Sequence, residues 1–555
     1  MDPPTLLHRQ QLIDMESVMK LSIIFFLLLG SILPLGGQSL SSFDLRLDTM
    51  TIPGLPGLHS FAVATHAGKW LLIGGRRDGM HQKFNAFGTS GANQQIYVVA
   101  PELGQVWQRP LSELPDTLRE QLSSTNMEFF QHHETLLFVG GYGRSEVAQN
   151  HITYPYLTLV DVPALMNAVT SANGTALIQH FQQIRDTFFA VTGGQLLPLA
   201  DTFYLVGGHR FDGVYSANSA NPTQFYTNAI RKFTLESLGN DMRVVHKSES
   251  VDELNLHRRD YNLTPQVFQN GENGLTAFSG VFQPGIALAP FLNIVEITPS
   301  GHAPVNGFNQ YLANYHCAKI PLWAQSANET HTLFFGGISG YWLDGNDSLR
   351  KDNRLPFVKT ISRVSRLQNG KYEEVPFAAE LPWYTGTSAE FMLADGVPTL
   401  PNGMVDYDLL PMGEQLLGYI VGGIVTPDNQ PNPFVTNTVG NTSASIRLIK
   451  VFLEKKTTSN TVPQPLNGHF DLGLTVSPNP AIDFWNVSLN LPRRAHCRAT
   501  LQDALGRIVQ RLDMGEHSAG AFGFDVATAN LSVGAYWLTV NVDGVYMETK
   551  TVLKQ

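Results

Sequence analysis

Pairs of glycine residues recur along this chain, and each pair ends a short apolar run. The runs read "WLLIGG", "LLFVGG", "FYLVGG", "TLFFGG" and "GYIVGG", and a weaker copy reads "LTAFSG". The copies lie about 60 to 90 residues apart, so they mark repeated structural units. The first residues of the pairs are Gly74, Gly140, Gly207, Ser279, Gly336 and Gly422.

The sequence around each pair repeats as well. A strand-like run and a short polar turn precede the glycines, as in "HSFAVATHAGKWLLIGG", which predicts a β-hairpin. Another alternating run follows, such as "QQIYVVA", and most units then offer a fourth, such as "QVWQR". Four short strands per unit, repeated six times, predict an all-β protein built as a β-propeller. The 49 glycines, 32 prolines and 15% charged residues agree with many short strands and turns.

Residues 40–455 resemble the Kelch-repeat family, in which the second strand of each four-stranded blade ends in Gly-Gly. An aromatic residue often lies in the fourth strand, as Trp107 does here. The resemblance implies a six-bladed Kelch-type propeller. Two features depart from the family pattern: Ser279-Gly280 replaces one glycine pair, and the units exceed the usual length of about 50 residues.

The last unit lacks a fourth strand of its own. Its third run, "SIRLIKVFL", leads into a polar segment at residues 456–470 that has no strand pattern and is expected to be a linker. A solitary alternating run, "FDLRLDTM", lies before the first unit at Phe43 to Met50. We expect this run to complete the last blade, because pairing the two ends leaves no open edge in the ring.

The amino terminus has the layout of a secretory signal peptide. A positive charge at Lys20 precedes an apolar stretch from Leu21 to Leu33 and small residues near position 37. Residues 1–37 are therefore expected to be removed, with the true translation start at Met15 or Met19. The alternative is a membrane anchor, although the stretch is shorter than the roughly 20 residues that span a bilayer. No other segment is long and apolar enough to cross a membrane.

From residue 471 to 555 the chain changes character. Strand-like runs such as "WNVSLNLP" alternate with turns, which predicts a small, immunoglobulin-like β-sandwich. Pro478 and Pro480 bracket Asn479 and are expected to form a turn that stops the ladder at that edge.

This terminal segment resembles the carboxy-terminal sorting domain of proteins exported by the type IX secretion system of Bacteroidetes. The landmarks are "SPNP", a D-x-x-G-R element, "LSVGAYWLTV" and a final basic and apolar strand. The resemblance implies the type IX secretion machinery as a partner, delivery to the outer cell surface or the medium, and removal of the tail. An ordinary immunoglobulin-like adhesion module is the alternative. The corresponding sorting-motif residues are Pro478, Asn479, Pro480, Asp503, Gly506, Arg507, Gly534 and Tyr536.

The segments that follow the glycine pairs are long, and they share one face of the predicted propeller. We call this the post-glycine face. Connections longer than about 12 residues are usually functional, so this face is the expected binding surface for a glycan or protein ligand. The alternative is that Arg and Asp near blade tips pair with each other and tie the loops together. The candidate ligand-binding residues are Arg76, Arg77, Asp78, His209, Arg210, Asp212, Tyr341, Trp342 and Asp344.

Signals for catalysis, metals or cofactors are poor, and none of the three is predicted. His132, His133 and Glu134 are expected at the tip of a turn on the opposite face, where adjacent side chains diverge. Cys317 lies in the strand-like "NYHCAKI", and the other cysteine, Cys497, lies in the tail. The net charge of −10 argues against nucleic-acid binding.

The sequence thus favours a secreted or surface-displayed binding module over an enzyme. Two alternatives stay open. One is an extracellular carbohydrate-active enzyme of the sialic-acid isomerase or lyase type, and the other is a structural component of the surface layer.

Overall fold

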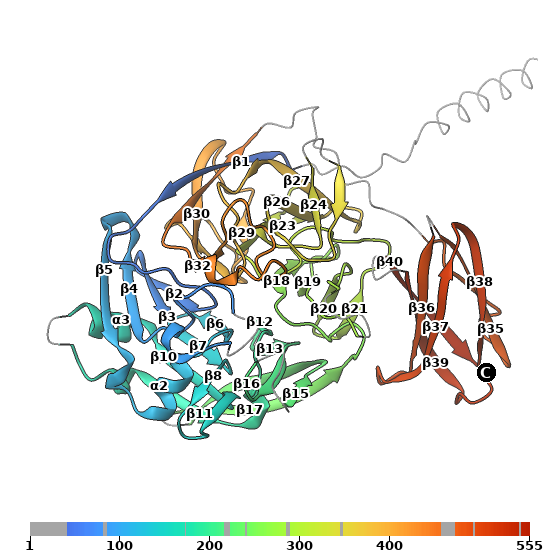
Figure 1. The fold of residues 1–555 in the computed structure, drawn as a ribbon, viewed down its shortest axis with the longest axis horizontal. Coiled ribbons are helices and arrows are strands. Elements are labelled where there is room, and N and C mark those ends of the chain that lie inside the picture. Colours follow the sequence, from blue (N-terminus) through green and yellow to red (C-terminus); the bar gives the residue numbers. More distant parts are fainter. Residues whose placement is uncertain are drawn as a thin grey trace, which may run out of the picture.

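The computed structural model describes residues 41–456 and 472–555, apart from 82–85, 172–173, 216–222, 239–240, 285–288, 345–347, 492–493 and 543–545. The predicted signal peptide at 1–37 and nearly all of the predicted linker at 456–470 lie outside these residues. Sheets dominate the described chain (Figure 1), so the prediction of an all-β protein is confirmed. The helices of the described part, α2 (Asp116–Leu122) and α3 (Val162–Thr170), are short, and neither is long or apolar enough to span a membrane.

Within the described chain, each of the six glycine-marked units contributes to a sheet that contains four antiparallel strands, and the fifth sheet gains one more strand. The first sheet contains β2 (Ala62–His66), β3 (Lys69–Ile73), β4 (Gln95–Ala100) and β5 (Gln105–Pro110). The second contains β6 (Glu128–His132), β7 (Thr135–Val139), β10 (Tyr156–Asp161) and β11 (Phe181–Arg185). The third contains β12 (Gln195–Leu199), β13 (Thr202–Val206), β16 (Ala229–Leu238) and β17 (Asp241–Val251).

The remaining sheets follow the same order of strands. The fourth contains β18 (Asn262–Val267), β19 (Asn273–Phe278), β20 (Val295–Thr298) and β21 (Gly301–Pro304). The fifth contains β22 (Lys319–Ala324), β23 (Glu329–Ile338), β26 (Phe357–Arg366) and β27 (Tyr372–Glu380), with β29 (Val405–Asp406) added parallel to β22. The sixth contains β28 (Ala389–Leu393), β30 (Gly413–Gly422), β33 (Leu448–Lys455) and β1 (Phe43–Met50).

The six sheets follow one another around a common centre (Figure 1), and the first strands β2, β6, β12 and β18 lie near it. Neighbouring first strands contact each other, from β2 and β6 through to β22 and β28. The hydrophobic core is divided among the interfaces between successive sheets. Leu71 of the first sheet packs with Phe138 of the second. Trp70 of the first also packs with Tyr419 of the sixth, with ring centroids 5.1 Å apart.

A closed circle of backbone hydrogen bonds links the six units at the start of their first strands. We call it the axial ring, and all six of its residues belong to the described chain. The amide of each residue donates to the carbonyl of a residue in the neighbouring unit, over 2.7 to 3.3 Å. In the order donor to acceptor, the circle runs Ser60, Ser388, His316, Asp260, Gly193, Asn126 and back to Ser60.

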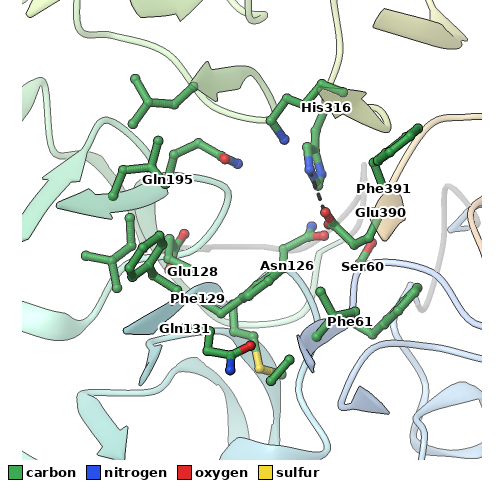
Figure 2. A pocket seen from close by; sticks show the side chains of 18 of the residues that line it. Ser60, Phe61, Asn126, Glu128, Phe129, Gln131, Gln195, His316, Glu390 and Phe391 are labelled. Atoms are coloured by element: carbon green, nitrogen blue, oxygen red, sulfur yellow. Dashed lines mark ion pairs between the residues drawn. The ribbon is translucent and has the colours of Figure 1, made fainter. Parts of the chain in front are cut away.

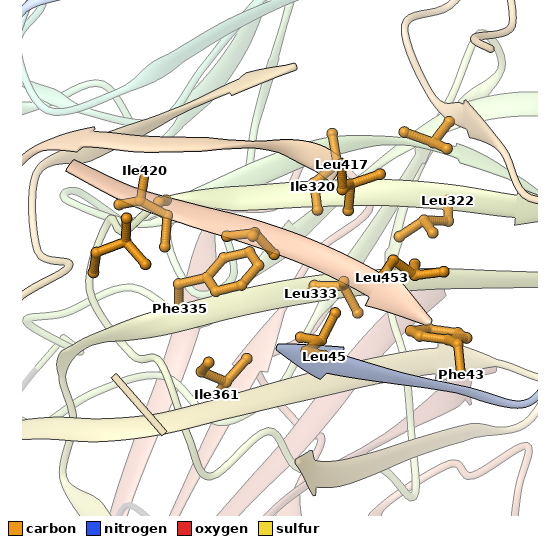
Figure 3. Close-up of a cluster of buried hydrophobic side chains, with 14 of the residues drawn as sticks. Phe43, Leu45, Ile320, Leu322, Leu333, Phe335, Ile361, Leu417, Ile420 and Leu453 are labelled. Atoms are coloured by element: carbon orange, nitrogen blue, oxygen red, sulfur yellow. The ribbon is translucent and has the colours of Figure 1, made fainter. Parts of the chain in front are cut away.

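Strand β1 closes the sixth sheet. It pairs antiparallel with β33, from Phe43 opposite Lys455 to Met50 opposite Leu448. Phe43 and Leu45 point into the core between the fifth and sixth sheets, where Figure 3 shows them beside Leu453. The prediction that the amino-terminal run completes the last unit is confirmed.

The glycine pairs lie where the second strands crowd the next unit. Gly140 has a φ of +64°, and a Cβ atom there would lie 1.8 Å from the carbonyl oxygen of Val191. Even the non-glycine member, Ser279, adopts a φ of +49°. The glycines therefore serve the ring's architecture, because they allow a left-handed backbone and a close approach that a side chain would prevent.

The segments after the glycine pairs are more regular than the predicted loops. Short two-stranded sheets form within them. The pairs are β8 (Tyr142–Ser145) with β9 (Asn150–Thr153), β14 (His209–Asp212) with β15 (Thr223–Tyr226), β24 (Tyr341–Leu343) with β25 (Leu349–Lys351), and β31 (Ile424–Val425) with β32 (Ser443–Ala444). Short 3₁₀ turns lie at Thr89–Gly91, Pro101–Leu103, Leu111–Glu113, Leu177–His180, Thr187–Phe189 and Val439–Asn441.

The tail forms two further sheets that share one core around the buried Trp485. One sheet contains β34 (Thr475–Ser477), β35 (Phe484–Leu491) and β38 (Gly520–Ala527). The other contains β36 (Ala495–Gln502), β37 (Ile508–His517), β39 (Gly534–Val542) and β40 (Tyr546–Lys554).

The tail contacts the ring of sheets beside the third and fourth units. The side-chain amide of Gln502 donates to Asp252 over 2.9 Å, and both residues are buried. Gly506 lies so close that a Cβ atom there would be 2.4 Å from the carbonyl oxygen of Val251. Two further hydrogen bonds join Asn541 to Gln283 and Thr549 to Asn306.

Candidate functional site

A cavity of about 390 Å³ lies among the first strands, which we call the axial cavity. Members of the axial ring line one end of it, including Ser60, Asn126 and His316. The lining continues along the strands to Thr65 and Gln131, near the turns between first and second strands. The cavity thus extends from the axial ring toward the face opposite the post-glycine face.

Glu128 of β6 is buried in the wall of this cavity (Figure 2), with 3% of its surface exposed. Its Oε1 accepts a hydrogen bond of 2.6 Å from the amide of Gly194. Its Oε2 is buried and has no hydrogen-bond partner among the described residues. Burial raises the pKa of Glu128 to about 8, and the negative charge of Asp260 acts in the same direction.

Glu390 and His316 lie side by side in the lining of the same cavity, with a carboxylate oxygen 3.4 Å from His316 Nε2 (Figure 2). Burial raises the pKa of Glu390 to about 7, although the nearby charge of Lys319 opposes this rise. Burial, assisted by Lys319, lowers the pKa of His316 well below its ordinary value. The imidazole is therefore neutral at neutral pH.

Asp260 completes the acidic part of the lining. Its Oδ2 lies 3.7 Å from Nε of Arg259, on the side of the post-glycine face. Burial raises the pKa of Asp260, and the charge of Arg259 opposes the rise. Three carboxyl groups, one lysine and one neutral histidine thus share the described lining of the cavity.

The remaining walls are amides and aromatic rings. Phe129 and Phe391 contribute apolar surface, and Asn126 and Gln195 contribute side-chain amides. Such a lining, mostly apolar with a few polar groups, is typical of small-ligand sites.

The predicted site residues lie in three separate groups on the post-glycine face. In the first unit, Arg76 is buried and forms an ion pair of 2.6 Å with Asp78. Burial raises the pKa of Asp78, but hydrogen bonds from His59 and Arg76 outweigh it and leave the pKa well below its ordinary value. Arg77 is exposed and lines a shallow groove together with Arg447.

In the third unit, His209 is buried, and its Nε2 lies 3.2 Å from Nη1 of Arg259. Burial and the positive charge of Arg259 lower its pKa well below the ordinary value, so His209 accepts this hydrogen bond as a neutral ring. Arg210 and Asp212 form an ion pair of 2.7 Å.

In the fifth unit, Tyr341 is buried against Tyr311, with ring centroids 5.0 Å apart. Trp342 is 39% exposed. Asp344 accepts a hydrogen bond of 2.6 Å from Arg350. Arg76, Arg210 and Arg350 thus pair with Asp residues of their own segments. Whether any residue of these groups binds a ligand stays a prediction.

Sequence reasoning did not identify Glu128, Asp260, His316 or Glu390. The sequence does contain a signal for these residues, because each lies at or near the start of the first strand of its unit. Aligning the six units on those strands would have brought their polar residues into register.

His132, His133 and Glu134 lie at the turn between β6 and β7, as predicted. Among the described residues, no three His, Cys, Asp or Glu side chains lie close enough together to hold a metal ion.

The sorting-motif residues of the tail lie in two places. Asp503 and Arg507 form an ion pair of 2.7 Å at a groove that Gly534 and Tyr536 also line. Asn479, between Pro478 and Pro480, instead pairs with the last strand, β40. Its side chain donates to the carbonyl of Thr551 over 2.9 Å and accepts from the amide of Leu553 over 2.8 Å.

Comparisons with known proteins agree with this reading of the tail. Residues 475–554 match the family model described as "Secretion system C-terminal sorting domain". The match supports sorting by the type IX system and implies a secreted or cell-surface protein. A search among curated proteins found no match. Among solved structures, the chain is similar to one titled "Structure of YjhT", with 10% identity, a TM-score of 0.38, and coverage of 71% of this chain and 99% of that chain.

Proposed function

We propose that this chain is an exported binding protein in which a six-bladed Kelch-type β-propeller carries a small immunoglobulin-like sorting domain. In this proposal residues 1–37 are a signal peptide, 40–455 the propeller, 456–470 a linker and 471–555 the sorting domain. The type IX machinery of a Bacteroidetes cell recognises the tail, delivers the protein to the outer surface and removes the tail. The sorting-domain match at residues 475–554 supports the export step.

We further propose that the propeller binds a glycan or protein ligand through the axial cavity. The observation that carries this proposal is the unpartnered, buried carboxyl oxygen of Glu128 in a lined cavity. A buried polar atom without a partner costs stability and suggests that a ligand or water satisfies it. The post-glycine face stays a second proposed contact surface, with the exposed Arg77 and Trp342 as its accessible side chains.

Export is tested in a host with a type IX system. The full chain and a form lacking residues 475–554 are expressed, and cells are probed with an external protease. We expect the full chain at the surface or in the medium, with an intact mass that lacks the tail. The shortened form should stay inside the outer membrane. Surface delivery without the tail would refute the proposed route.

An enzyme is the second candidate, of the carbohydrate-active isomerase or lyase type. The observation that favours it is the presence of Glu128, His316 and Glu390, with shifted pKa values, in one cavity. Such clusters are common at catalytic sites. Incubating the protein with candidate saccharides and following product by NMR separates the two. Saturable binding without product supports the binding module, and turnover supports the enzyme.

A further inference from the structure

The position of Glu128 is determined by its surroundings. Its Oε1 accepts a hydrogen bond from the amide of Gly194. Gly194 itself lies close to the backbone of the neighbouring strand. A Cβ atom at Gly194 would lie 3.0 Å from the carbonyl oxygen of Val206. The second oxygen, Oε2, therefore keeps a defined place in the cavity wall and is not turned toward another protein group of the described chain.

The other charged groups of the described lining have counterparts. Asp260 lies beside Arg259, and Glu390 lies beside His316 and under the influence of Lys319. Among the described residues, Glu128 has no cationic neighbour of this kind. The titratable groups that act on it electrostatically are Asp260 and Tyr261, and neither favours its ionised form.

A carboxyl group in this setting keeps its proton at neutral pH, because burial raises its pKa to about 8. A protonated carboxyl presents one O–H donor together with acceptor capacity. That combination suits a hydroxyl group, which both donates and accepts.

The rest of the lining suits the same partner. The amides of Asn126 and Gln195 can each donate and accept, and the rings of Phe129 and Phe391 offer flat apolar surface. An anionic group would meet Asp260 and Glu390, and the charge of Lys319, the lysine of the described lining, already acts on Glu390. A cationic group beside Glu128 would require Glu128 to lose its proton.

We propose that the axial cavity binds an uncharged, polyhydroxylated group, the terminal sugar unit of a neutral glycan, and that Glu128 donates a hydrogen bond to one of its hydroxyls. This inference rests on the proposed binding function of the cavity. Glu128 is a specificity-determining residue in it, since its proton decides which charge the ligand can carry.

The test uses the tail-bearing chain and three probe classes: neutral mono- and oligosaccharides, a sugar acid and an alkyl amine. Affinity is measured by calorimetry at about pH 6 and about pH 9.5, on either side of the pKa of Glu128. The variants are Glu128→Gln, Glu128→Ala and the control Glu272→Gln, which changes an exposed carboxylate at the β18–β19 turn.

We expect a neutral saccharide to bind at the lower pH and to weaken severalfold at the higher pH. Glu128→Gln should bind at both pH values, because its amide still donates, so the pH dependence should become smaller. Glu390, which lines the same cavity and has a pKa raised to about 7, accounts for the part that remains. Glu128→Ala should lose about tenfold in affinity. Glu272→Gln should behave as the unchanged protein.

Three results would overturn the inference, and they differ from failure of the proposed function. Amine binding that strengthens with pH and is lost in Glu128→Gln would show that the cavity binds cations. Preference for the sugar acid would show that it binds anions. Neutral-sugar binding whose pH dependence is the same in Glu128→Gln as in the unchanged protein would remove Glu128 from the site. Absence of binding by any probe class, in contrast, would refute the binding function itself.

Discussion

The backbone amide of Ser60 donates a hydrogen bond of 3.0 Å to the carbonyl of Ser388. Ser60 precedes the first strand of the first sheet, and Ser388 precedes the first strand of the sixth. This contact completes the axial ring. The first and last units are therefore joined twice, by this hydrogen bond near the centre and by the pairing of β1 with β33 in the sixth sheet. The β1–β33 pairing and the axial ring together limit how far any single sheet can move relative to its neighbours.

Removing β1 should destabilise all six sheets. Phe43→Ala removes a buried ring from the core between the fifth and sixth sheets and should cost about 3–5 kcal/mol in the free energy of unfolding. Deleting Phe43 to Met50 should lower the melting temperature further, because it opens the sixth sheet. Denaturant unfolding followed by circular dichroism measures both. Asp48→Ala, an exposed change on the same strand, should stay within about 0.5 kcal/mol. A deletion variant that melts like the full chain would contradict this role of β1.

Gly140→Ala should be far more damaging than Gly104→Ala, although the two glycines have φ values of +64° and +63°. Both substitutions place an alanine in the left-handed region, at a cost of about 1–2 kcal/mol. Only Gly140 is also confronted by the carbonyl oxygen of Val191, whereas nothing lies within 4 Å of a Cβ at Gly104. The loss at Gly140 should therefore exceed about 4 kcal/mol. Equal losses in chemical unfolding would mean that the crowding at the glycine pairs is unimportant.

The contribution of Glu374 to stability should decline as the pH rises from about 5 to about 8. The buried, neutral His209 and His316 act in the opposite direction, because their contribution is lost as the pH falls below the ordinary pKa of histidine. Glu374 is buried, and burial raises its pKa to about 8, although amides of Tyr311 and Leu312 that donate to it oppose the rise. The folded chain then holds this proton more tightly than the unfolded chain, so this contribution to stability is greatest below the ordinary pKa of a glutamate and is lost as the pH approaches 8.

Glu374→Gln keeps an acceptor and cannot ionise, so it should flatten this decline in a series of melting curves. Glu128 contributes in the same direction, so part of the slope should remain. Glu380→Gln, an exposed change on the same strand, should leave the slope as it is. An unaltered slope in Glu374→Gln would show that the carboxyl group is ionised in the folded protein.

Gly506→Ala should release the tail from the ring of sheets. A Cβ atom at Gly506 would lie 2.4 Å from the carbonyl oxygen of Val251, so the methyl group cannot be accommodated while the tail is docked. Gly515→Ala is the matched control, because both glycines have a φ of +77° and nothing lies within 4 Å of a Cβ at Gly515. Small-angle scattering should show a larger radius of gyration for Gly506→Ala only. The same radius for both variants would argue against the docked arrangement.

The fold was predictable from local signals. Each glycine pair sits at a backbone position that needs a left-handed conformation, and such positions restrict the residue type strongly. The alternation in "FDLRLDTM" likewise identified a strand, and the last unit lacked a fourth strand of its own to pair with β33. In the tail, Asn479, Asp503 and Arg507 were named from the resemblance to the sorting-domain family, and their role in sorting stays a prediction.

The candidate site was not predictable in this way. Sequence alone favoured the long segments of the post-glycine face, and it could not tell that Arg76 would be buried against Asp78 or that His209 would be buried beside Arg259. Pairing of this kind depends on which loops meet, and no local pattern encodes it.

The sequence by itself thus determined the repeat, the positions of its strands, the closing strand and the export tail, because these depend on residue type and spacing within single units. Tertiary structure alone decided the axial cavity. Glu128, Asp260, His316 and Glu390 come from four different units, and closing the ring brings them together out of water. Their shifted pKa values follow from that shared burial, which no stretch of sequence contains.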